Sequence, residues 1–251
     1  MKVTILGCGT SGGVPRIGEI WGVCDRNNPK NRRRRSSILV EEGETMIMVD
    51  TTPDLREQCL DNCITRLDGV LYTHDHADHT HGIDDLRGIK QCMKKKVEVY
   101  ANRETRDVLL QRFEYIFKQQ GSYPTVANMN EIDLAPFRID AIDIQPFRQI
   151  HGDSESYGFR LNKIAYSTDF NVIPEESFAQ LQDLDLWVVD ALRPEPHPTH
   201  SHLQQTLDYI ERVKPKRAIL THMTWDMDYE TLKRELPPHV EPAYDGMVIE
   251  L

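Results

Sequence analysis

Residues 69–88, GVLYTHDHADHTHGIDDLRG, place four histidines and four aspartates directly after an apolar run. A short apolar run between turn signals is typical of a buried strand, and side chains two residues apart on a strand point to the same side. His74 and His76 are therefore expected at a strand end, where both imidazoles can bind one metal ion. If the chain then turns towards a helix that begins after His79, Asp78 and His79 can bind a second ion.

A solvated polar loop is the alternative interpretation of this stretch, but four ligand-type residues at this spacing favour a metal site. Three further donors follow other predicted strands: His151 ends DIQPFRQIHG, Asp169 ends KIAYSTD and His222 ends RAILTH. Each of these alone is more often a surface or core polar residue. Because strand ends can converge on one rim, their joint placement predicts a shared site.

The remaining sequence alternates short β-like runs with helical stretches, and its length suits one large domain. Strands dominate both halves, which predicts an α/β (α+β) fold of two packed sheets with helices on the outer faces. The expected strands lie at 2–9, 36–43, 45–52, 68–74, 97–102, 185–192, 217–223 and 246–251, with hairpins between 131 and 169. The expected helices follow His79 and lie at 53–62, 103–117, 175–181, 201–213 and 228–236. Residues 119–130 are irregular and are interpreted as a surface loop, with a lid or a dimer contact as alternatives.

Composition narrows the class of protein. The formal net charge of −10 argues against a broad nucleic-acid surface, which would need many Lys and Arg contacts to phosphates. No apolar run is long enough to span a membrane, and the start of the chain lacks a signal-peptide pattern, so we expect a cytoplasmic protein. The odd number of cysteines, five, argues for reduced thiols rather than a disulfide framework.

HDHADH at 74–79, followed in order by a His, an Asp and a His, resembles the metallo-β-lactamase fold hydrolases over nearly the whole chain. Within that superfamily, four stretches are similar to the PhnP-type phosphoribosyl 1,2-cyclic phosphate phosphodiesterases: LGCGTSGGVPRIG (6–18), NRRRRSSILV (31–40), HTHGIDDLR (79–87) and YDGMVIEL (244–251). The resemblance implies an αββα four-layer sandwich of two mixed sheets, formed by residues 1–251 as a single domain, with metals at one edge.

The resemblance also implies two divalent metal ions, zinc or manganese, with iron or nickel also compatible with mixed imidazole and carboxylate ligands. The implied ligands are His74, His76 and His151 for one ion, Asp78, His79 and His222 for the other, and Asp169 as the bridge. A metal-bridging hydroxide would attack phosphorus, which makes Asp78 part of the catalytic set. Asp50 would orient a ligand loop from behind, or would cap the helix that follows it; both interpretations stay open.

A proton donor for the leaving oxygen is expected in PHPTHSHLQQTL. His200 falls where PhnP-type enzymes place a histidine near the substrate, and its ordinary pKa of about 6.5 suits this role. His202 is the competing candidate for acid or substrate contact. The alternative is that both are exposed at a helix start, with Ser201 as the N-cap.

One family feature is missing from this sequence. Many PhnP-type enzymes carry an extra zinc on a cysteine cluster in an early loop and a later histidine. Here Glu19 and Trp21 stand where cysteines would be, and Trp225 stands where the histidine would be, so only Cys24 remains. We therefore expect no structural Cys-cluster zinc and a free thiol at Cys24.

Arginines offer further contacts to phosphate. One guanidinium of the run Arg32–Arg35 is a candidate because its fork matches phosphate oxygens; at least two of the four are expected to be merely solvated. Arg87 is a weaker candidate.

The function expected from these features is di-metal-dependent hydrolysis of a phosphodiester bond in a small cyclic-phosphate or nucleotide-like substrate. One alternative is a tRNA 3′-processing endonuclease of the ribonuclease Z type, although the sequence has no long basic arm. Another is a non-catalytic nucleotide-binding module, against which the complete ligand set argues. The expected partner is a small anionic substrate. No membrane or nucleic acid is expected, and a homodimer is compatible with the sequence.

Overall fold

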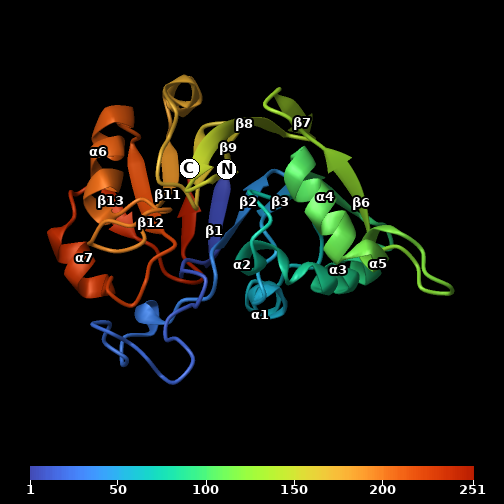
Figure 1. The fold of residues 1–251 in the computed structure, drawn as a ribbon, viewed down its shortest axis with the longest axis horizontal. Helices are drawn as coiled ribbons and strands as arrows, with labels where there is room; N and C mark the ends of the chain where they lie inside the picture. The colour runs from blue at the N-terminus through green and yellow to red at the C-terminus, as the bar shows by residue number, and fades with distance from the viewer.

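The two β-sheets of the computed structural model, which describes residues 1–251, each contain seven strands (Figure 1). The first sheet has the order β14, β1, β2, β3, β4, β5, β6. Its strands are β1 (Lys2–Gly7), β2 (Ser37–Glu42), β3 (Thr45–Val49), β4 (Gly69–Leu71), β5 (Val97–Ala101), β6 (Ala127–Glu131) and β14 (Val248–Glu250). Pairing is antiparallel from β14 to β3 and parallel from β3 to β6, so this sheet is mixed.

The second sheet has the order β13, β12, β11, β10, β9, β8, β7 and is also mixed. Its strands are β7 (Phe137–Ile139), β8 (Ile142–His151), β9 (Ser154–Leu161), β10 (Ile164–Ser167), β11 (Leu186–Asp190), β12 (Arg217–Thr221) and β13 (Val240–Pro242). The strands from β10 to β13 run parallel, whereas β7 to β10 pair antiparallel. The carboxyl ends of β10, β11 and β12 therefore meet at one edge of the sheet.

Successive side chains of β2 and β3 alternate between the two faces of the first sheet, and both faces are covered. On β2, Ile38 and Val40 join the large cluster between the sheets, whereas Leu39 between them faces the helices. Ile47 and Met48 of β3 divide in the same way. Successive strand residues point to opposite faces, so a strand covered on both sides has a continuous apolar sequence.

Helices cover the outer face of each sheet. The helices are α1 (Leu55–Asp61), α2 (Ala77–Thr80), α3 (Leu86–Met93), α4 (Arg103–Arg112), α5 (Glu114–Phe117), α6 (Leu203–Val213) and α7 (Tyr229–Glu235), with 3-10 turns at Pro29–Asn31, Ile83–Asp85 and Glu175–Leu181. Leu55, Leu86 and Leu109 pack with the outer face of the first sheet. Ile210 of α6 and Leu232 of α7 join the large cluster, which also contains Trp187 and Ile219 of the second sheet. The expected αββα sandwich is confirmed.

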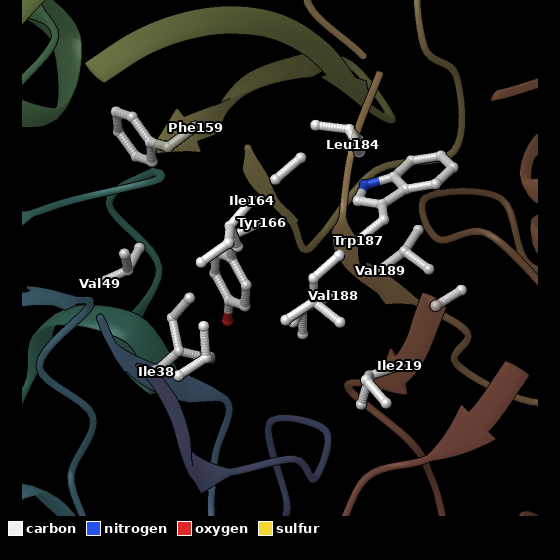
Figure 2. Packing of buried hydrophobic residues seen from close by; sticks show 14 of the residues in the cluster. Ile38, Val49, Phe159, Ile164, Tyr166, Leu184, Trp187, Val188, Val189 and Ile219 are labelled. Atoms are coloured by element: carbon white, nitrogen blue, oxygen red, sulfur yellow. The ribbon is translucent and has the colours of Figure 1, made fainter. Parts of the chain in front are cut away.

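The core between the sheets holds the two halves together. Figure 2 shows Ile38 and Val49 of the first sheet on one side of Tyr166, with Val188 of the second sheet on the other. Phe159 lies in the same cluster and is fully buried. Apolar burial of this extent is the main favourable contribution to folding, and here it also fixes the relative position of the two sheets.

Several element boundaries differ from the sequence expectation. Strand β4 ends at Leu71, before the histidines, because the Thr73 N–H donates to Asp50 Oδ1 at 2.9 Å instead of to a neighbouring strand. Helix α2 begins at Ala77, not after His79. The expected helix at 175–181 is a 3-10 turn, and the loop expected at 119–130 contains the start of β6. The short strand β13 was not predicted. None of the helices combines the length and the apolar character that crossing a membrane requires.

Replacement of a central core side chain should measure the contribution of this packing. Ile219 on β12 is fully buried, so Ile219→Ala should lower the free energy of unfolding by about 2–5 kcal/mol. Val248→Ala, at a position 52% exposed on edge strand β14, is the control and should change it by less than about 0.5 kcal/mol. Urea unfolding followed by circular dichroism measures both, and equal losses would contradict the assignment of the core.

Candidate metal centre

The site lies where strand ends from both sheets converge. Asp50 follows β3 directly, His151 is the last residue of β8, and His222 follows β12. Asp169 lies two residues beyond β10. The carboxyl ends of parallel strands are the usual ligand-binding edge of such sheets, and the packing of the two sheets brings these donors together.

The donors form two groups that share one carboxylate. In each group all ligand atoms lie within 4.8 Å of one another; the groups are His74, His76, His151 and Asp169, and Asp78, His79, His222 and Asp169. Asp169 Oδ2 faces the Nε2 atoms of His74 at 3.7 Å and His151 at 3.9 Å. Asp169 Oδ1 faces those of His79 at 3.2 Å and His222 at 3.3 Å. The two oxygens of one side chain thus serve different groups, as a bridging carboxylate requires.

The local chain path differs from the one expected for residues 74–79. His74 and His76 lie in the loop after β4 rather than on the strand, and His76 is the N-cap residue of α2. Asp78 and His79 lie within the first turn of α2. The chain changes direction at the start of α2, and this change separates His74 and His76 from Asp78 and His79. The two pairs of ligands are therefore separated by a loop and a helix, and not by a strand end followed by a turn.

Unpartnered nitrogen atoms show that this donor set fits metal ions. Three Nδ1 atoms are held by other groups: His74 Nδ1 lies 3.0 Å from the Thr73 hydroxyl, His79 Nδ1 lies 2.7 Å from Asp50 Oδ2, and His151 Nδ1 donates to the Thr199 carbonyl oxygen at 2.7 Å, whereas His222 Nδ1 is unpartnered. The Nε2 atoms of His74, His79 and His222 are buried without a hydrogen-bond partner. A histidine held at Nδ1 presents the lone pair of Nε2, which is the usual arrangement of a metal-binding imidazole.

The local charges also favour cations. Burial lowers the pKa of His74 and of His151, which keeps both imidazoles neutral and able to coordinate. Burial opposes ionisation of Asp169, but His222 and His79 outweigh it and hold its pKa well below the usual range. Burial lowers the pKa of His79, yet the carboxylates of Asp169, Asp78 and Asp50 together raise it. The site therefore stabilises positive charge where the second group of donors converges.

Backbone strain is concentrated at three residues of the centre. Asp50, Asp169 and His222 have φ values of 65°, 51° and 57°. Non-glycine residues in this left-handed region cost about 1–3 kcal/mol each and persist where the surrounding structure holds them. All three lie just after buried strands, so the core holds the strained backbone and aims these side chains at one point.

Asp50 contacts the ligand loop and not the following helix. Its Oδ2 accepts from the Thr73 hydroxyl at 2.8 Å in addition to its contact with His79. Helix α1 is preceded by Asp54 instead, so the helix-capping alternative for Asp50 is wrong. Asp50 is fully buried and ties β3, the loop after β4 and helix α2 together.

His200 joins the site through a residue that the sequence reasoning missed. Asp190, the last residue of β11, is fully buried, and its Oδ2 lies 3.1 Å from His200 Nδ1. Its Oδ1 lies 3.8 Å from His222 Nδ1. The sequence signal is a carboxylate directly after an apolar run, LWVV at 186–189, although the expected strand, 185–192, extended past it. The imidazole of His200 stacks on that of His222 with ring centroids 4.9 Å apart.

Two other candidates lie away from this centre. His202 is the N-cap residue of α6 and is absent from both donor groups and from the cavity wall. Ser201 is not the N-cap, because its buried hydroxyl pairs with that of Thr206 at 2.7 Å. Arg87 lines a different cavity, donates to Asp84 at 2.7 Å and stacks over Tyr123. Its side chain is thus engaged by the 3-10 turn before α3 and by Tyr123.

The centre opens into a cavity of about 410 Å³ without a single apolar lining residue. Besides the donors and His200, its wall includes Ser11, Asp153, Ser154 and Thr199. A cavity so polar suits a small charged substrate better than an apolar one. The arginine run Arg32–Arg35 is absent from this wall and lines a separate cavity.

Cys24, in the loop after β1, and Trp225, in the segment after His222, both contact other side chains or backbone. The Arg33 guanidinium lies 3.8 Å from Cys24 Sγ. Trp225 packs so closely on Gly22, which has a φ of 55°, that a Cβ there would meet Trp225 ring carbon at 2.2 Å. These contacts join the early loop to the segment after His222.

Comparison with known proteins gives one matching family model and several relatives of different activities. A family model described as the β-lactamase superfamily domain matches residues 45–223. A solved diphosphatase from the PhnP family is 38% identical, with a TM-score of 0.93, and the match covers 100% of this chain and 96% of that one. An octanoyltransferase of Porphyromonas gingivalis is 32% identical over 98% of this chain, and a ribonuclease Z of a Bradyrhizobium species is 28% identical over 60% of it. This chain spans about half the length of these two relatives, 51% and 47%.

Asp50→Asn should weaken metal binding without unfolding the protein. The amide keeps the size of the side chain but removes the charge opposite His79 Nδ1, and losses of this kind lower metal affinity by about 10- to 100-fold. Titration with zinc in a competing chelator measures the effect. Asp153→Asn, in the same cavity wall but outside both donor groups, is the control; an equal loss in both variants would contradict the role of Asp50.

Proposed function

The chain belongs to the metallo-β-lactamase superfamily and, within it, to the PhnP family. From this membership we propose that it is a two-metal hydrolase, which cleaves a P–O bond in a small phosphodiester or diphosphate. The observation that carries the proposal is the placement of Asp169, whose two oxygens face separate groups of imidazoles. The diphosphate is included because the solved relative at 38% identity is a diphosphatase.

His74, His76 and His151 would hold one ion, Asp78, His79 and His222 would hold the other, and Asp169 would contribute an oxygen to each. When bound, two divalent cations lower the pKa of water and neutralise charge that develops on a phosphoryl group. The chain's own contribution is to hold the imidazoles and the carboxylates in place before any substrate arrives. Zinc and manganese both suit this mixture of nitrogen and oxygen donors.

His200 is proposed to protonate the leaving oxygen. Burial lowers its pKa, but Asp169 and the hydrogen bond with Asp190 raise it more, to about 9. An imidazolium held at Nδ1 by Asp190 keeps the proton on Nε2, which lies 3.9 Å from Asp169 Oδ2 on the cavity wall. A protonated, oriented imidazole beside the reacting phosphate is what general acid catalysis requires.

A substrate panel tests the proposed function. Zinc- or manganese-loaded protein should hydrolyse at least one of ribose 1,2-cyclic phosphate, 2′,3′-cyclic nucleotides, bis(p-nitrophenyl) phosphate and ADP. Asp169→Ala should abolish this activity, because removing the bridge affects both ions. A tRNA precursor belongs in the panel because of the similarity to a ribonuclease Z. Cleavage of the precursor alone, or of nothing, would overturn the proposal.

His200→Ala separates proton transfer from metal binding. Both ions should remain, while hydrolysis of a 2′,3′-cyclic nucleotide, which has a poor leaving group, should slow by about 10²- to 10⁴-fold. Bis(p-nitrophenyl) phosphate needs little protonation and should lose much less. Equal slowing of both substrates would mean that His200 binds a phosphate oxygen instead, and His202→Ala is the control for a neighbouring histidine outside the cavity.

A further inference from the structure

His222 differs from the other buried histidines of the centre, because no hydrogen bond holds its ring. His74, His79 and His151 each have an Nδ1 atom held by a neighbouring group at 3.0 Å or less. Both ring nitrogens of His222 are buried without a partner. Asp190 Oδ1 lies 3.8 Å from His222 Nδ1, which is too far for a hydrogen bond. The orientation of this ligand must therefore come from its backbone.

The backbone of His222 is strained, with a φ of 57°. A residue in this conformation persists only where the surrounding structure holds it. Strand β12 fixes the chain before His222, whereas the segment after His222, residues 223–227, belongs to no helix and to no strand of either sheet. Contacts with other parts of the chain hold this segment; for example, the Met223 N–H donates to the Cys8 carbonyl oxygen at 2.9 Å.

Arg33, which lies between the first 3-10 turn and β2, binds the segment after His222 at two points. Its Nη1 donates to the Thr224 carbonyl oxygen at 3.1 Å, and its Nη2 donates to the Met227 carbonyl oxygen at 2.6 Å. Arg33 is itself fixed, because it is 2% exposed and its backbone N–H donates to the Val14 carbonyl oxygen at 2.8 Å. We call these two hydrogen bonds from the guanidinium the Arg33 clasp.

The Arg33 clasp is costly, because no carboxylate pairs with the buried guanidinium. Its Nε has no partner. Its link to negative charge runs through Asn31, whose Oδ1 accepts from Arg33 at 3.4 Å and whose Nδ2 donates to Asp228 at 2.7 Å. Burial of an unpaired charge opposes folding. The gain that offsets this cost is the rigid planar fork, which supplies two fixed donors to the segment after His222.

A second contact holds the same segment independently of the guanidinium. Trp225 packs on Gly22 in the loop after β1, where an added Cβ would meet a ring carbon of Trp225 at 2.2 Å. The N–H of Val23 donates to the Trp225 carbonyl oxygen at 3.0 Å. In Figure 1 this blue loop extends below the two sheets, on the side of α7. The segment is thus held at Thr224, Trp225 and Met227.

We propose that Arg33 is a positioning residue for His222. By holding the segment after His222, the Arg33 clasp sets the backbone of that ligand and aims its Nε2 at Asp78 Oδ2 and Asp169 Oδ1, 3.6 and 3.3 Å away. This inference rests on the proposed function, in which His222 holds one of two ions. The effect is selective: loss of the clasp weakens the ion that His222 holds and not the ion that His151 holds.

Metal titration of Arg33 variants tests this selectivity. In Arg33→Met, zinc titration against a competing chelator should show one of the two binding steps weakened by about 10-fold, the lower end of the range for groups that orient a ligand. Arg33→Lys keeps the charge but cannot bridge both carbonyl oxygens, so it should behave like Arg33→Met; full recovery with Lys would overturn the role of the fork. Ile142→Ala, fully buried at the start of β8, is the control for lost stability and should leave both steps unchanged.

A double-mutant cycle assigns the weakened step to a ligand. Added to His222→Ala, Arg33→Met should cause no further loss of zinc affinity, because the ligand that it positions is gone. Added to His76→Ala, it should still lower the zinc affinity by about 10-fold. Equal losses in both backgrounds, or no loss in either, would overturn the proposal.

Hydrogen exchange of the metal-free protein tests the clasp without any ion. In Arg33→Met the amides of residues 222–227 should exchange faster by about 10-fold, as expected for loss of a hydrogen bond to a charged group, whereas those of residues 73–79 should not change. Gly22→Ala displaces Trp225 and should have the same selective effect, so it replaces Arg33→Met if that variant does not fold. Unchanged exchange, or equal acceleration in both regions, would contradict the clasp.

The outcomes separate the two proposals. A wild-type protein that binds fewer than two ions, but in which loss of Arg33 selectively exposes residues 222–227, would overturn the proposed function and leave the Arg33 clasp standing. Two bound ions and hydrolysis of a phosphate ester, with no selective loss of zinc affinity in Arg33→Met, would overturn the clasp and leave the proposed function standing.

Discussion

The carboxylate of Asp169 is the contact on which the rest of the site depends. Its two oxygens face imidazoles at the ends of β8 and β12 of the second sheet and imidazoles in the loop and helix α2 that follow β4 of the first sheet. For one side chain to do this, the ends of β10 and β12 and the segment after β4 must be positioned together. That requirement explains why a large apolar core lies directly behind a cavity that is lined only by polar residues.

The core supports this contact by holding strained backbone in place. Asp50, Asp169 and His222 adopt left-handed conformations just after buried strands. A loop with few packing contacts would relax such residues, whereas strand ends fixed by a core cannot. Asp50 also positions the ligand loop and helix α2, because its carboxylate accepts the backbone N–H of Thr73 and contacts the ring of His79. The metal donors are thus positioned by packing first and by hydrogen bonds second.

The loop after β1 is connected to the same framework. Arg33 donates to carbonyl oxygens of the segment that follows His222, and Arg35 holds Ser11 at the edge of the metal cavity. Displacement of this loop would therefore disturb the wall of the metal cavity.

The sequence by itself determined the sheets, the outer helices and the identity of most donors, because strand alternation and ligand chemistry are local properties. Asp169, His151 and His222 could be found as polar residues at the ends of apolar runs, and the same signal was available for Asp190. Tertiary structure alone decided where β4 ends, because the side chain of Asp50, distant in sequence, takes the backbone N–H of Thr73. It also decided that Arg87 and His202 lie away from the centre and that Arg33 is buried without a counter-ion. Such outcomes depend on contacts between segments far apart in the chain, which no local pattern encodes.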